Sequence, residues 1–130
     1  MPTATQSEKT PVILIVDDQD VVVRLNEILL RRTGATVITA RSGKEAIEKA
    51  MEHQPRIAVM DLQMPDMTGD AVTRFFRQKK EFASMKVVIV TSNGKEETRK
   101  RCMDAGADFF VTKPIQPNNL LDLIRSLLKR

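Results

Sequence analysis

The chain has 130 residues, a length that fits one domain with its own hydrophobic core. Its one cysteine excludes an internal disulfide, and no apolar run approaches the roughly 20 residues that a membrane-spanning helix needs. The net charge is only +4, and tryptophan and tyrosine are absent, so we expect a cytoplasmic domain with neither a membrane nor a nucleic acid as partner.

Residues 1–10 are polar and are predicted to form a flexible tail ahead of a single domain over residues 11–130. In that domain, short apolar runs alternate five times with helix-period patterns. The runs cover residues 12–16, 36–39, 57–60, 87–90 and 109–111. Several are continuous rather than alternating, which is typical of strands buried on both faces of a parallel sheet.

Between these runs, apolar residues recur at helical spacing and predict amphipathic helices. The groups are Val21, Leu25, Ile28 and Leu29; Val72, Phe75 and Phe76; and Leu120, Leu121, Ile124, Leu127 and Leu128. The segment 95–105 has only Cys102 and Met103 as sizeable apolar side chains, so we expect the most mobile helix there. The alternation predicts a three-layer α/β domain with right-handed crossovers.

Local signals mark where these helices begin and end. Ser42 and Glu45 have the spacing of a capping box. Gly34 and Gly106 each lie between a helical pattern and a strand, where a left-handed residue ends a helix. Pro117 fits the first turn of the last helix.

Polar side chains follow four of the five predicted strands. They are Asp17, Asp18, Asp61, Thr91, Ser92 and Lys113. Because an open parallel sheet binds ligands outside the carboxyl ends of its strands, we expect these groups to converge. Converging carboxylates raise one another's pKa or demand a cation, and Mg²⁺ suits oxygen ligands of this kind. Asp61 is then placed to attack phosphorus, with Lys113 and the Thr91 hydroxyl stabilising the transferring oxygens.

This ordered set resembles the receiver domain of two-component response regulators, over residues 11–129. The matching pieces are Val16-Asp17-Asp18, residues 61–69 (DLQMPDMTG), Thr91-Ser92, residues 104–108 (DAGAD) and Lys113-Pro114. The resemblance implies a flavodoxin-like (βα)5 fold with strand order 2-1-3-4-5. It also implies a signalling switch that catalyses only its own phosphotransfer and dephosphorylation.

The resemblance implies a role for each residue of the site. Asp61 would be the phosphoacceptor. Asp18 would bind Mg²⁺ directly and Asp17 largely through water, with the backbone carbonyl of Gln63 completing the protein's share. Lys113 would contact the phosphoryl group, and its peptide bond to the following proline would be cis.

The resemblance also implies a switch and its partners. Thr91 would move toward the phosphoryl group and Phe110 would swing inward behind it, although the family commonly has tyrosine at that position. Gln63 and Asn93 would tune the lifetime of the phosphoryl group. The phosphoryl donor would be a sensor histidine kinase or a histidine phosphotransfer protein.

The output face would consist of the helix over 95–105, the strand over 109–111 and the last helix. The basic residues on it are Lys95, Arg99, Lys100 and Arg101. We therefore expect an acidic downstream protein or a homodimer with interleaved charges.

Other interpretations remain open. A haloacid-dehalogenase-like phosphatase also uses an aspartate nucleophile, but it needs a second acid two residues later, where this chain has Gln63. The domain is either a complete single-domain regulator, which the initial methionine and polar tail favour, or the receiver of a longer regulator or hybrid kinase. We expect His53 to be a solvated surface residue and Cys102 to be a packing residue.

Overall fold

The five apolar segments form one parallel sheet. The computed structural model describes residues 10–129, so the predicted tail lies almost entirely outside the described residues. The strands are β1 (Val12–Val16), β2 (Thr36–Ala40), β3 (Ile57–Asp61), β4 (Lys86–Thr91) and β5 (Phe109–Thr112). Their order is β2-β1-β3-β4-β5, which confirms the predicted flavodoxin-like fold.

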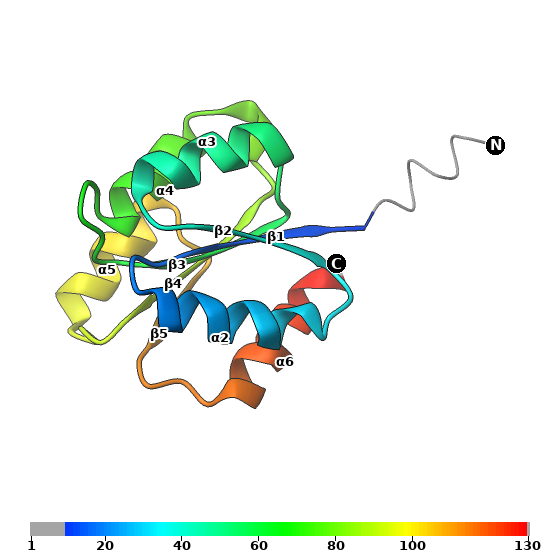
Figure 1. The fold of residues 1–130 in the computed structure, drawn as a ribbon. Helices are drawn as coiled ribbons and strands as arrows, with labels where there is room; N and C mark the ends of the chain where they lie inside the picture. Colours follow the sequence, from blue (N-terminus) through cyan, green and yellow to red (C-terminus); the bar gives the residue numbers. More distant parts are fainter. Residues whose placement is uncertain (1–9, 130) are drawn as a thin grey trace.

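Helices cover both faces of this sheet. They are α2 (Asp20–Arg31), α3 (Gly43–His53), α4 (Gly69–Arg77), α5 (Glu96–Ala105) and α6 (Pro117–Leu128), with a short 3₁₀ turn η1 at Lys80–Phe82. Figure 1 shows α3 and α4 above the sheet and α2 and α6 below it. The long connection over the sheet between successive parallel strands is what places a helix on one face or the other.

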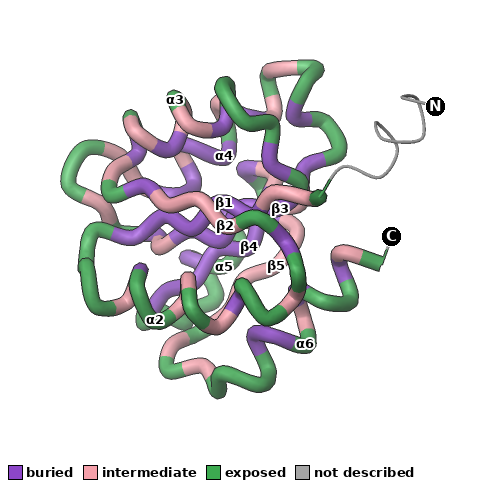
Figure 2. The backbone as a smooth tube through the Cα atoms, turned by 45° about the vertical axis from the view of Figure 1, so that its right-hand side comes forward, coloured by how far each residue is buried: buried purple, intermediate pink, exposed green. Residues whose placement is uncertain are grey.

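Side chains of the central strands alternate between two buried clusters. Leu14 and Val16 of β1 belong to the cluster under α3, α4 and α5, whereas Ile13 and Ile15 belong to the cluster over α2 and α6. Figure 2 shows the central strands as mostly buried and the outer sides of the helices as exposed. Burial on both faces explains why these strands have continuous apolar sequences.

Most of the features predicted at the helix ends are present in the structure. Gly34 and Gly106 have positive φ angles of 89° and 112°, and Pro117 lies in the first turn of α6. The Ser42 hydroxyl accepts a hydrogen bond from the Glu45 N–H, as a capping box requires. The reciprocal half differs from the prediction, because the Glu45 carboxylate accepts from the N–H of Arg41 rather than from that of Ser42.

Three of the four residues in the predicted apolar stripe of α2 are exposed, and the fourth, Leu29, packs against the buried cluster over α2 and α6. Val21, Leu25 and Ile28 are 70%, 62% and 58% exposed, and Val23 and Leu30 are the residues that α2 buries. The helical spacing was correct, but the sheet contacts a neighbouring face of the helix. The result is an exposed apolar surface, which we call the α2 stripe.

The predictions for α6 and for Cys102 and His53 agree with the structure. Leu120, Leu121, Ile124 and Leu127 of α6 are buried as predicted. In α5, Cys102 is fully buried, which confirms its packing role. The high mobility expected of the helix α5 remains a prediction. His53 ends α3 on the exposed surface. None of the described helices is long and apolar enough to cross a membrane.

Candidate functional site

Strand register brings three charged side chains to one edge of the sheet. Val16 pairs with Met60, so Asp17 follows β1 at the level where Asp61 ends β3. Thr91 pairs with Thr112 across β4 and β5, so Lys113 follows at the same level. The crevice lies at the carboxyl ends of β1 and β3, where the strand order reverses, on the left of Figure 1.

The three aspartates and the lysine of the predicted set converge. Carboxylate oxygens of Asp17, Asp18 and Asp61 lie within 4.8 Å of one another. The Lys113 ammonium lies 3.6 Å from Asp17 Oδ2 and 3.7 Å from Asp61 Oδ1. Asp17 is buried and Asp18 is exposed, so the cluster opens to solvent on one side.

The surroundings of Asp61 disfavour its charge. Burial raises the pKa of the Asp61 carboxyl above its ordinary value, and the neighbouring charges of Asp17 and Asp18 raise it further. Lys113 and a hydrogen bond from the backbone N–H of Gln63 act in the opposite direction without cancelling the rise. One lysine therefore does not neutralise this cluster.

This donor set fits Mg²⁺. The three carboxylates supply hard oxygen ligands, and their uncompensated repulsion falls when a divalent cation binds. A site made of a few carboxylates with one open side also leaves coordination positions for water and phosphate oxygens.

The chain leaves Asp61 through a closely packed turn. The N–H of Gly69 donates to the carbonyl of Leu62 over 2.8 Å. A Cβ atom on Gly69 would lie 2.8 Å from the Asp61 carbonyl oxygen, so only glycine fits at this approach. The first turn of α4 therefore packs directly against the backbone of Asp61.

The predicted switch residues lie behind this edge. Thr91 is buried, and its hydroxyl accepts a hydrogen bond from the Asn93 N–H over 3.1 Å. Phe110 is partly buried against the cluster under α5. The peptide bond between Lys113 and Pro114 is cis, as the resemblance implied. Gln63 and Asn93 are exposed around the site.

The profile of the response regulator receiver domain family matches residues 13–125. The chain belongs to this family. The polar-differentiation response regulator DivK of Brucella ovis is 30% identical over 119 residues, which span 92% of this chain and 97% of DivK. Members of the family are signalling phosphoacceptors that work with histidine kinases, so this receiver is not a conventional phosphatase.

Solved receiver structures share the whole fold. Chemotaxis protein CheY4 of Vibrio cholerae superimposes with a TM-score of 0.86 at 25% identity, covering 92% of this receiver and 99% of CheY4. The receiver domain of DrrB, described as activated by BeF3, has the same TM-score and identity and covers 94% of this chain and 100% of its own.

Two acids with clear structural contacts were not singled out from the sequence. Asp66 accepts two backbone hydrogen bonds from the start of α3, and Asp70 forms ion pairs with Arg74 and Arg101. Both acids lie near the start of a helix, where acidic residues are common. Their positions in the sequence therefore did not predict these contacts. Their partners are distant in sequence, except for Arg74.

Proposed function

We propose that this receiver accepts a phosphoryl group on Asp61 from a phosphohistidine of a sensor kinase or phosphotransfer protein. The observation that supports the proposal best is the position of the Asp61 carboxylate between two further aspartates and the Lys113 ammonium. The same chemistry would serve a single-domain regulator or the receiver of a longer protein.

The transfer needs little from the protein beyond position and charge. A carboxylate oxygen of Asp61 forms a bond to phosphorus as the bond between phosphorus and the donor imidazole breaks, and the imidazole takes up a proton. Lys113, within 4 Å of Asp61, neutralises charge on the phosphoryl oxygens. The turn at Gly69 holds the backbone of Asp61 in place during the transfer.

Asp17, Asp18 and Asp61 would hold Mg²⁺, with the backbone carbonyl of Gln63 as a further ligand. The cation would neutralise charge on the transferring phosphoryl group. Gln63 and Asn93 are both exposed beside the site, where they would control the access of water and so the lifetime of the phosphoryl group.

Thr91 and Phe110 would transmit the conformational change that follows phosphorylation of Asp61. The Thr91 hydroxyl, now bonded to the Asn93 N–H, would turn to the phosphoryl oxygens, and Phe110 would occupy the space behind it. This motion would alter the face of α5, β5 and α6. Its basic residues on α5 suit an acidic partner or a second copy of this chain.

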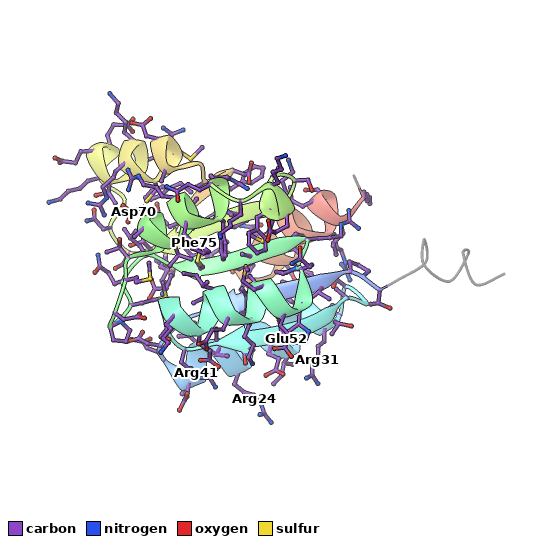
Figure 3. The ribbon with its side chains drawn as sticks, turned by 90° about the horizontal axis from the view of Figure 1, so that it is seen from above. Arg24, Arg31, Arg41, Glu52, Asp70 and Phe75 are labelled. Carbon is purple, nitrogen blue, oxygen red and sulfur yellow. The ribbon has the colours of Figure 1, made fainter. Side chains whose placement is uncertain are left out.

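The α2 stripe is the surface that would receive the phosphoryl donor. Leu25 lines a concave region that extends to Lys113 and Ile115 beside the site, with a volume of about 600 Å³. Arg24 lies at the margin of α2 in Figure 3, where Arg31 pairs with Glu27 and Arg41 pairs with Asp20. A donor protein with an apolar ridge would fit here and present its phosphohistidine to Asp61.

Intact-mass spectrometry with acetyl phosphate tests the proposal. The wild-type chain should gain one phosphoryl group only when Mg²⁺ is present, and Asp61→Asn should gain none. An adduct that persists in Asp61→Asn would refute the assignment of the phosphoacceptor.

The same assay tests the docking surface when the donor is a phosphorylated histidine phosphotransfer protein that is active on the wild-type chain. Leu25→Lys should slow transfer about tenfold or more and leave the reaction with acetyl phosphate unchanged. Met51→Lys is the matched control, because Met51 is an exposed apolar residue on α3, on the other face of the sheet. Equal effects of the two substitutions would refute the docking surface.

A further inference from the structure

The loop that follows Asp61 is attached to α3 through the Asp66 side chain, with methionine side chains packed on either side of it. Residues 62–68 connect β3 to α4 and include Gln63, whose N–H bonds to the Asp61 carboxylate. The Leu62 N–H donates to the Val90 carbonyl, and the Leu62 carbonyl accepts from the N–H of Gly69, which joins the two ends of the loop. The part between these contacts reaches toward the first turn of α3.

Asp66 makes the polar contact between the loop and α3. Its Oδ1 accepts from the N–H of Gly43 over 2.8 Å, and its Oδ2 accepts from the N–H of Lys44 over 2.9 Å. These two backbone hydrogen bonds lower the pKa of Asp66 even though the side chain is exposed to solvent. Both oxygens of one carboxylate therefore bind the helix start, where the peptide N–H groups carry partial positive charge.

Packing reinforces this contact. A Cβ atom at Gly43 would lie 2.8 Å from the Cβ of Met67, so the Met67 side chain packs directly against the start of α3. Met64 and Met67 also pack on the buried cluster between the sheet and α3. The loop is thus attached to α3 by side chains on both sides of Asp66.

The bonds of Asp66 add to the N-cap of α3 rather than replace it. The Ser42 hydroxyl already accepts the Glu45 N–H, which is the ordinary N-cap bond of this helix. Asp66 satisfies two different N–H groups and joins the helix to a segment more than 20 residues away. Asp66 therefore stabilises the position of the loop as well as the start of the helix.

We infer that Asp66 is a positioning residue that fixes the loop 62–68 and so sets the geometry of Gln63 and Asp61 for Mg²⁺. The inference rests on the proposed function, since it concerns the same site. It makes the start of α3 a structural support of the metal site, although α3 supplies none of the proposed ligands. Residues that orient ligands without touching the metal commonly alter affinity by about tenfold or more.

Two helix-cap substitutions separate positioning from stability. Asp66→Ala and Ser42→Ala each remove a side-chain acceptor from the same helix start, but only Asp66→Ala releases the loop. Titration calorimetry with Mg²⁺ should show affinity weakened about tenfold in Asp66→Ala and less than about twofold in Ser42→Ala. Asp66→Asn, which keeps one of the two acceptor oxygens and loses the charge, should lie between wild type and Asp66→Ala.

Amide exchange without Mg²⁺ provides a readout that does not depend on the metal. The Gly69 N–H, bonded to Leu62, should exchange faster in Asp66→Ala than in Ser42→Ala. Equal Mg²⁺ affinities and equal Gly69 exchange in the two variants would overturn the inference and leave the proposed function intact. A wild-type chain that binds no Mg²⁺ would overturn both.

Discussion

At the scale of single residues, the site depends on charges of one sign held close together. Asp61 is partly buried beside two other carboxylates, and Lys113 is the cation that contacts it within 4 Å. This arrangement is unfavourable without a metal and becomes favourable when one binds. Affinity for the cation is therefore obtained at the expense of the stability of the metal-free protein.

Asp61→Asn should raise the melting temperature of the metal-free protein by a few degrees near neutral pH. The raised pKa of Asp61 means that its ionised form is less favourable in the folded than in the unfolded chain, so Asp61 lowers stability once the pH exceeds the folded-state value. The difference from wild type should shrink as the pH falls toward the ordinary value of 3.8, because both states then bind the proton.

Differential scanning calorimetry at several pH values, with a metal chelator present, measures this effect. Added Mg²⁺ should reverse it by stabilising wild type more than the variant. A variant that melts below wild type in metal-free neutral buffer would show that the carboxylate cluster is not strained.

At the scale of helices and strands, α5 has little apolar surface to hold it and depends on a polar contact. Its buried residues are Thr98, Cys102 and Ala105. Arg101 on α5 reaches Asp70 in the first turn of α4 over 3.2 Å, and Figure 3 shows Asp70 beside these two helices. Asp70 is buried, so the pair is better shielded from water than an ordinary surface pair.

Arg101→Gln should lower the free energy of unfolding by about 1 kcal/mol, since it leaves the buried Asp70 with Arg74 as its remaining guanidinium partner. Arg99→Gln is the matched control on the same helix. Arg99 pairs with the exposed Glu96 over 3.6 Å, so its removal should cost less than about 0.5 kcal/mol. Urea unfolding followed by circular dichroism measures both.

The loss of unfolding free energy caused by Arg101→Gln should disappear at acidic pH. Burial alone would raise the pKa of Asp70, but the Thr68 hydroxyl, Arg101 and Arg74 hold it below its ordinary value. An acid with a lowered folded-state pKa stabilises the fold above 3.8 and loses that contribution as the pH falls through the folded-state value. Equal losses in Arg101→Gln and Arg99→Gln at neutral pH would argue against a special role for this pair.

At the scale of the whole molecule, the site and the proposed output face are different surfaces joined by β4 and β5. Thr91 ends β4 beside Thr112 of β5, and Phe110 lies two residues before Thr112 on the same strand. Coupling between the two surfaces requires contacts that differ between the phosphorylated and unphosphorylated states.

Beryllofluoride with Mg²⁺, which mimics the phosphoryl group, should slow amide exchange mainly in residues 91–112. Thr91→Ala should still bind the mimic at Asp61 but lose the slowing in α5 and β5, because the hydroxyl that senses the phosphoryl group is gone. Hydrogen-exchange mass spectrometry measures both effects. Slowing confined to the loops around Asp61 would place the output elsewhere.

The sequence by itself determined the fold class, the carboxyl ends of the strands to within one residue, and the candidate site. Alternation of continuous apolar runs with helix-period segments allows few folds other than a parallel sheet covered by helices. In such a sheet all carboxyl ends lie at one edge, so Asp17, Asp61 and Lys113 could be brought together before any coordinates were known. These features depend on local pattern and on topology.

Only the tertiary structure decided which faces and which distant side chains meet. Val21, Leu25 and Ile28 have the spacing of a buried stripe, but the position of α2 on the sheet turns them to solvent. Asp66 looks like an ordinary loop acid until α3 is placed beside it. Helical period fixes which residues share a face, whereas the packing of all elements together determines which face is buried and which charges are paired.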